Sequence, residues 1–237
     1  MASLASLLRQ GEFVVTAELN PPKSAAASVV RRRADLLKGV VDAVNLTDSN
    51  RANVAMSAIA AAVLVRAAAS LAAGKLLNGD EVKQPPRYFI GATASPADPK
   101  DVDRTLEKVD AGAEFLQTQP VFDPAPFSQW LTEIRKRAKD VAILAGVLIL
   151  RSAEQADRLA KVPGIALPDV IRKRIHDAAD GEAEGIAIAI ETVRALRALP
   201  GVNGVHLYAI EWPEAIPIVV RGAGLLPRPT VKEVATA

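Results

Sequence analysis

The sequence predicts an α/β fold of the TIM type, a (β/α) barrel shortened to about six strand-helix units, and two observations lead to this prediction. Short apolar segments rich in β-branched residues alternate with longer segments of helical periodicity along the 237 residues. Such alternation is typical of parallel strands joined by helical crossovers, in a barrel or in a doubly wound sheet. No glycine-rich phosphate-binding fingerprint follows any expected strand, which disfavours the dinucleotide-binding and P-loop forms of the doubly wound sheet. The barrel is therefore favoured.

Six segments have the properties of buried parallel strands. Each is short and mostly apolar, and each is bounded by Pro, Gly or Asn. The expected strands are residues 13–19, 43–47, 88–94, 115–121, 141–149 and 204–210.

The segments between them have helical periodicity. Residues 54–77 are rich in alanine and contain no proline, and only Gly74 interrupts the run, so we expect mostly helix there and no strand. The expected helices are residues 25–38, 54–77, 101–111, 126–138, 153–160, 168–179, 182–199 and 213–222.

Composition indicates one domain, residues 1–237, in a cytoplasmic protein. No linker or composition shift divides the chain, and no apolar run is long enough to span a bilayer. The absence of cysteine excludes disulfides, thiolate metal sites and a Cys nucleophile. The formal net charge is +2, from 29 Lys and Arg against 27 Asp and Glu, which lacks the excess of basic residues typical of a nucleic-acid-binding protein. We expect neither a nucleic acid nor a membrane as partner.

The first expected strand ends in the carboxylate of Glu18, just before Pro21 and Pro22. In an alternating β/α protein the carboxyl ends of the strands carry the ligand-binding side chains, so Glu18 is the leading catalytic candidate. The alternative is a solvated strand-end carboxylate or a helix cap.

The other strand ends are also polar, but carboxylates are few among them. The amides and hydroxyls favour a ligand that is a polar heterocycle bound by hydrogen bonds, and they disfavour a metal ion. His176 and His206 have no partner at metal-ligand spacing and are interpreted as structural. The sequence contains no G-x-S-x-G motif, which disfavours a Ser-His-Asp hydrolase. The strand-end residues are Glu18, Asn20, Thr47, Asp48, Ser49, Asn50, Thr93, Ser95, Gln117, Gln119 and Glu211.

Several of these motifs, in order along the chain, resemble those of the methylenetetrahydrofolate reductase family. The most specific is a K-V-D-A-G-A helix end followed by a T-Q-x-x-F-D strand. The resemblance implies a TIM barrel that carries a flavin, usually FAD, through which NADH or NADPH reduces a folate one-carbon unit. The matching segments are residues 17–23, 44–50, 108–113, 118–123 and 146–148, with Gln155.

The resemblance also implies roles for individual residues. Glu18 matches the general acid that protonates the folate and opens its five-membered ring. Under a flavin this carboxyl group would lose solvation, which raises its pKa and lets it hold a proton near neutral pH. Gln119 matches the glutamine that binds the pterin, and Gln155 matches a second substrate-side glutamine.

On the cofactor side, Thr47 and Ser49 match the strand end that contacts the flavin, and Lys108 matches a basic residue near its phosphates. The alternative for Lys108 is a solvated helix lysine.

The chain departs from the family pattern in its first half. The third and fourth β/α units are missing, including the strand that ends in L-x-G-D near the flavin. Residues 77–80 spell L-N-G-D, but no expected strand precedes them and Pro85 follows, so we interpret them as a turn. A six-stranded barrel is harder to close than an eight-stranded one. We therefore expect either the 54–77 helix to cover the gap or a homo-oligomer to form there.

Three functions remain open: a flavin-dependent methylenetetrahydrofolate reductase, a flavin-independent folate reductase, and a non-catalytic folate-binding or scaffold protein with a truncated barrel.

Overall fold

The structure, a computed structural model, describes residues 3–19, 27–46, 58–76, 78–86, 88–98 and 100–231. In these ranges all six expected strands are present, and they form one parallel sheet. The strands are β1 (Val14–Leu19), β2 (Ala43–Leu46), β3 (Gly91–Ala94), β4 (Phe115–Pro120), β5 (Ala142–Leu148) and β6 (Gly204–Tyr208).

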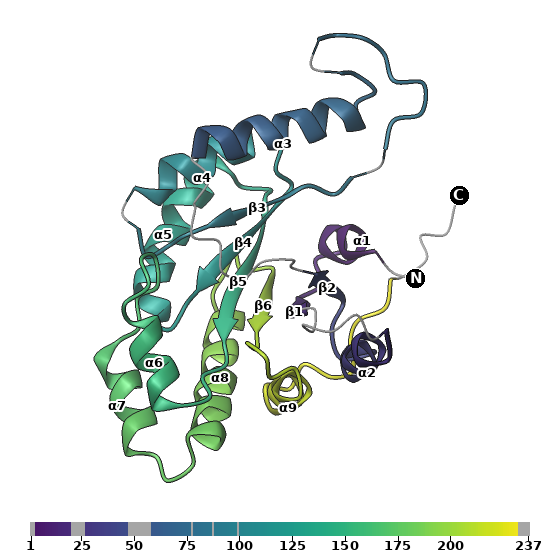
Figure 1. Cartoon of the computed structure of the whole chain (residues 1–237). Helices are drawn as coiled ribbons and strands as arrows, with labels where there is room; N and C mark the ends of the chain where they lie inside the picture. Colours follow the sequence, from purple (N-terminus) through teal and green to yellow (C-terminus); the bar gives the residue numbers. More distant parts are fainter. Residues whose placement is uncertain are drawn as a thin grey trace.

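The strand order, β2-β1-β6-β5-β4-β3, is that of a (β/α) barrel opened at one place. Neighbours in the sheet are neighbours in sequence, and β1 pairs with the last strand, as in a closed barrel. Only β2 and β3, among the described strands, are consecutive in sequence without being paired. The opening thus falls where the sequence lacks the third and fourth units, and the sheet is a curled half-barrel (Figure 1).

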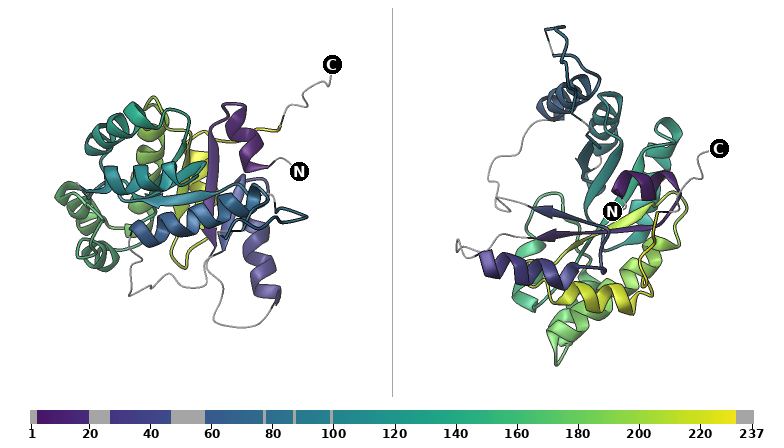
Figure 2. Two further views of the ribbon diagram at one scale, coloured as in Figure 1. Left: turned by 90° about the horizontal axis from the view of Figure 1, so that it is seen from above. Right: turned by 90° about the vertical axis from the view of Figure 1, so that its right-hand side faces the viewer.

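Helices cover the outer face of this sheet, except α1, which lies at the amino ends of the strands (Figures 1 and 2). Their positions agree with the expected helices, apart from α1, which the sequence analysis did not predict. None of the described helices is long and apolar enough to cross a membrane. They are α1 (Leu4–Arg9), α2 (Ala27–Leu37), α3 (Ala58–Ala72), α4 (Asp101–Asp110), α5 (Pro124–Arg137), α6 (Ala153–Leu159), α7 (Asp169–Asp177), α8 (Gly181–Arg197) and α9 (Ala215–Gly222).

The main core lies between the outer face of the sheet and these helices. Alternate strand residues such as Val15, Ile143 and Val205 are fully buried against α5, α8 and α9. All residues of β5 are buried, as expected for a central parallel strand covered on both faces.

The inner face divides into an apolar lower part and a polar upper part. At the amino ends of the strands, Val14 and Leu144 pack with Leu7 of α1, which closes the bottom of the half-barrel. The Ser3 hydroxyl accepts a hydrogen bond from the Ser6 N–H and caps this short helix. Polar side chains follow toward the carboxyl ends, where a (β/α) barrel binds its ligands.

The long alanine-rich segment is one helix over its described part, α3, and the described residues 58–76 contain no strand. This agrees with the expectation for residues 54–77. Of the two alternatives expected at the gap, a covering helix is not what the described part of α3 forms, because it packs along α4, where Val65 contacts Ala111 and Ala113. The other alternative, a homo-oligomer, stays a prediction. Helix α3 extends the outer helical layer beside β3 (Figure 1).

Candidate active site

The upper inner face collects polar side chains from three strands. In parallel strands, paired residues point to the same face, and the pairs here are Thr16 with His206 and Glu18 with Asn45. Tyr208 follows His206 at the next inner position of β6. Glu18 is half-buried where β1 ends, so the sequence-predicted acid lies at the mouth of the half-barrel.

Curling of the sheet brings its two halves into contact across this face. The Asn45 side chain on β2 donates a hydrogen bond to the Gln117 carboxamide on β4 (Nδ2 to Oε1, 2.9 Å). In the sheet order, β1, β6 and β5 lie between these two strands. The bond therefore joins β2 to β4 across the inner face of the curled sheet.

His206 lies deep in the inner face and is fully buried. Its Nδ1 is 2.8 Å from the Thr16 hydroxyl oxygen, and its Nε2 has no hydrogen-bond partner among the described residues. Burial lowers the pKa of His206 to about 3, so the ring is neutral at physiological pH.

Tyr208 stands between His206 and the mouth. The two rings meet edge to face, with centroids 4.5 Å apart. Burial raises the pKa of Tyr208 to about 12; a hydrogen bond with the Gln117 side chain opposes this effect, and the nearby negative charge of Glu18 adds to it. The phenol is therefore protonated, and it donates a hydrogen bond to the carbonyl oxygen of Thr118 (2.9 Å).

Gln119, the expected pterin-binding residue, lies in an irregular part of β4. The register between β4 and β5 shifts between Gln117 and Pro120, which indicates a β-bulge that includes Gln119. Gly146 of β5 makes room for it, because a Cβ atom there would lie 2.4 Å from the Thr118 carbonyl oxygen.

Lys108, the expected phosphate-side residue, is only 8% exposed, so the alternative of a solvated helix lysine is wrong. Its Nζ donates to the carbonyl oxygen of Thr93 near the end of β3 (2.6 Å). Burial lowers the pKa of Lys108, and the charge of Asp101 opposes this effect. The amine thus lies at the mouth, but it is turned into the strand end.

Gln155, the second expected substrate residue, lies in the first turn of α6, just after β5. Its Oε1 accepts a hydrogen bond from the Arg151 N–H (2.7 Å), and its own N–H donates to the Ser152 hydroxyl (3.3 Å). The carboxamide oxygen therefore caps the helix start.

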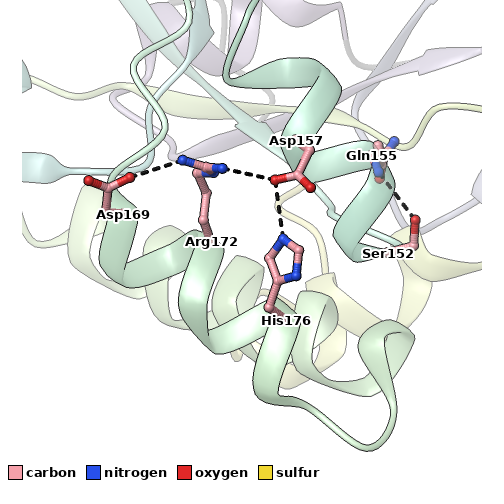
Figure 3. A network of polar contacts seen from close by, with 6 residues as sticks. All are labelled: Ser152, Gln155, Asp157, Asp169, Arg172 and His176. Carbon is pink, nitrogen blue, oxygen red and sulfur yellow. Dashed lines mark hydrogen bonds and ion pairs between the residues drawn. The ribbon is translucent and has the colours of Figure 1, made fainter.

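The lower part of α6 is tied to α7 by a polar network (Figure 3). Asp157 accepts a hydrogen bond from Arg172 (3.0 Å), and His176 Nε2 is 3.1 Å from the same carboxylate oxygen. This network fixes the helix that carries Gln155.

Two loops meet at the rim of the mouth. The Arg151 guanidinium after β5 lies over the ring of Trp212 after β6, 5.4 Å from its centroid, and donates to Glu182 (2.8 Å). Trp212 thus forms part of the rim.

The described residues do not complete a flavin site. Thr47 and Ser49 lie outside them, and Lys108 is engaged with β3. Residues 78–80 form the expected turn, in which the Asn78 amide donates to the Asp80 carboxylate (2.8 Å), so this aspartate is on the surface and not on a barrel strand. The described chain also contains no group of three or more His, Asp or Glu side chains that could hold a metal ion.

Comparison with known proteins identifies the family. The sequence profile of methylenetetrahydrofolate reductase matches residues 88–224, more than half of the chain. The chain belongs to the methylenetetrahydrofolate reductase family. The matched range contains Lys108, Gln119 and Gln155, and Glu18 precedes it.

Two curated relatives show how much of a family member's length this chain matches. Methylenetetrahydrofolate reductase 1 of Schizosaccharomyces pombe is 28% identical over 134 residues, 53% of this chain and 22% of the relative. A probable methylenetetrahydrofolate reductase (NADPH) of Caenorhabditis elegans is 25% identical over 142 residues, 58% of this chain and 21% of the relative. The chain thus spans about a fifth of these relatives.

A solved structure has the same fold over nearly the whole chain. It is an uncharacterized protein from Clostridium thermocellum that binds two copies of 5-methyl-5,6,7,8-tetrahydrofolic acid. The TM-score is 0.61 at 12% identity, and the match covers 92% of this chain and 97% of the other.

Sequence reasoning missed Tyr208 and Thr16 as inner-face residues, and it interpreted His206 only as structural. The sequence does carry a signal for these residues, because polar residues recur at every second position in two otherwise apolar strands. These are Thr16 and Glu18 in β1, and His206 and Tyr208 in β6. Such alternation in a buried strand marks the face that carries polar function.

Proposed function

We propose that this chain binds a reduced folate at the inner face of the half-barrel and reduces 5,10-methylenetetrahydrofolate to 5-methyltetrahydrofolate. The observation that carries the proposal is the polar inner face at the carboxyl ends of the strands, in a chain of this family. Glu18, Tyr208 and the amides of Asn45 and Gln117 supply an acid and several hydrogen-bonding groups on one face of the sheet. A pterin ring has donors and acceptors that match such amides.

Glu18 acts as the acid in this proposal. It protonates a ring nitrogen of the folate, the bond from that nitrogen to the methylene carbon breaks, and the resulting iminium carbon accepts a hydride to become the methyl group. The phenol of Tyr208 stays protonated beside it, so Tyr208 adds no second negative charge.

Gln119 and Gln155 bind the substrate in this proposal. Gln119 pairs with the pterin, which a carboxamide can meet as donor and acceptor at once. Gln155 presents its amide NH₂ to the folate, because its oxygen already caps α6. NADH or NADPH, with FAD as carrier, is the electron source that family membership implies.

A second candidate, a non-catalytic folate-binding protein, is favoured by the opening between β2 and β3. The L-N-G-D turn supplies no flavin-side aspartate, so folate binding could persist without reduction. A third candidate, a folate reductase that passes hydride directly from the nicotinamide, requires the same folate site without a flavin.

One set of measurements on the purified chain separates these functions. We expect 5-methyltetrahydrofolate to bind in a calorimetric titration, flavin bands in the visible spectrum, and NAD(P)H oxidation that depends on methylenetetrahydrofolate. Colourless protein with this oxidation supports direct hydride transfer, and colourless, inactive protein that binds folate supports the second candidate. Absence of folate binding overturns the folate site itself.

A further inference from the structure

The bulge in β4 is stabilised from the neighbouring strand β5. From Gln117 to Pro120 the chain advances three residues, while its partner advances two, from Leu144 to Gly146. The Gly146 N–H donates to the Thr118 hydroxyl (2.9 Å), which in turn donates to the Gln119 carbonyl oxygen (2.8 Å). The bulge is therefore a specific conformation, and bulges re-aim the side chains that they carry.

A second support reaches the bulge from β6, across β5. The Tyr208 hydroxyl donates to the Thr118 carbonyl oxygen, over a separation of 90 residues in sequence. Gly146 leaves space for the backbone of the bulge because it has no Cβ atom. A Cβ atom there would lie 2.4 Å from the Thr118 carbonyl oxygen and 2.8 Å from the Gln119 carbonyl oxygen.

The Tyr208 ring is itself held in place. The buried His206 ring meets it edge to face, and the Thr16 hydroxyl fixes His206 through Nδ1. Contacts thus run without a break from β1 through β6 to the bulge of β4.

We propose that Tyr208 is a positioning residue for Gln119: its hydroxyl holds the Thr118 carbonyl, which sets the direction in which the bulge presents the Gln119 carboxamide to a folate. This inference rests on the proposed folate site, since Gln119 binds substrate only there.

Calorimetric titration with 5-methyltetrahydrofolate tests the proposal through Tyr208→Phe, which removes the hydroxyl and keeps the ring. Loss of one net hydrogen bond predicts about 2- to 12-fold weaker binding. Tyr88→Phe is the matched control, because Tyr88 is 52% exposed and we expect it to bind folate like the wild type. Failure of the wild type to bind folate would count against the proposed function, whereas equal binding by wild type and Tyr208→Phe would overturn only this inference.

A double-mutant cycle separates positioning from direct contact. If Tyr208 acts through Gln119, Tyr208→Phe has no further effect in a Gln119→Ala background. If the two losses multiply, Tyr208 acts independently of Gln119 and the inference is wrong. Gly146→Ala disturbs the same bulge from β5, and wild-type folate affinity in that variant would also contradict the inference.

Discussion

Glu18 is the residue on which the proposed chemistry depends. It lies one residue before the end of β1, one inner-face position beyond Thr16, and its negative charge adds to the raised pKa of Tyr208. A half-buried carboxyl group close to a protonated phenol is suited to deliver a proton to a bound folate.

Glu18→Gln keeps the shape of this side chain and removes the acid. We expect folate reduction to fall by about 10²- to 10⁴-fold, the usual contribution of general acid catalysis, while folate binding is retained. Steady-state assays and calorimetric titration measure the two effects. Glu12→Gln, before the other end of β1, is the control, and a loss below about threefold in Glu18→Gln would remove Glu18 from the mechanism.

Gln119→Ala tests binding. Leaving polar groups of the pterin unpaired costs roughly 1 to 3 kcal/mol, so kcat/KM for the folate should fall by about 5- to 150-fold. Gln129→Ala, an exposed glutamine on α5, should leave kcat/KM unchanged. An equal fall in nicotinamide oxidation with an artificial electron acceptor would point to a folding defect.

His206 makes stability depend on pH. Its pKa is about 3 in the folded protein and about 6.5 when unfolded, so below pH 6.5 the unfolded chain binds a proton that the folded chain does not. Stability should therefore fall as the pH decreases from 6.5 toward 3, by about 2 kcal/mol between pH 7 and pH 5.

Urea unfolding at the two pH values measures this loss. His206→Gln should remove most of the pH dependence, whereas His176→Gln, the control, should retain it. An unchanged pH dependence in His206→Gln would show that other groups cause it.

At the scale of elements, the segment after α9 is bound to the edge of the sheet by one buried ion pair. Asp42, just before β2, accepts hydrogen bonds from the Val15 N–H (2.7 Å) and from Arg228, and the side chains of the pair are 3% and 8% exposed. Arg228 also donates to the carbonyl oxygens of Phe13 and Leu225. The pair thus joins the first two strands to the C-terminal part of the chain.

Arg228→Met should destabilise the protein strongly, because it leaves the Asp42 carboxylate buried without its cation. Breaking a buried pair in this way costs about 3 to 5 kcal/mol, which urea unfolding would detect. Arg221→Met, on the exposed side of α9, is the control. A difference below about 1 kcal/mol between the two variants would show that the ion pair does not hold this edge.

At the scale of the whole molecule, the half-barrel has two strand edges that a closed barrel lacks. β2 and β3 are the ends of the described sheet, and Val44 on β2 is 39% exposed. The described helix α3 packs along α4, on the β3 side of the opening (Figure 1). Exposed edges and apolar side chains favour association with another chain.

We therefore expect a homo-oligomer at micromolar concentration. Sedimentation velocity measures it, and Val44→Lys should shift the distribution toward monomer, because a charged edge opposes strand pairing. Val170→Lys, at a valine of α7 that is 65% exposed, is the control. A wild-type monomer at all concentrations would contradict the prediction.

Much of this architecture could be predicted from sequence because it depends on local patterns. The apolar runs of the six strands, the alanine-rich helix, and the absence of a strand signal within residues 54–77 are readable within short windows. They indicated both the shortened barrel and the place of its opening. The short helix α1 was missed, since six residues give too little periodicity.

The fold class, the family and the position of Glu18 near the end of β1 could be read from the sequence, because each follows from short motifs of residues close together in the chain. The tertiary structure alone decided which polar groups meet. The Asn45–Gln117, Tyr208–Thr118 and Thr16–His206 contacts join residues 72, 90 and 190 positions apart. Their partners depend on strand register, on the bulge and on the curl of the sheet, which are set by packing over the whole domain and not by local propensity.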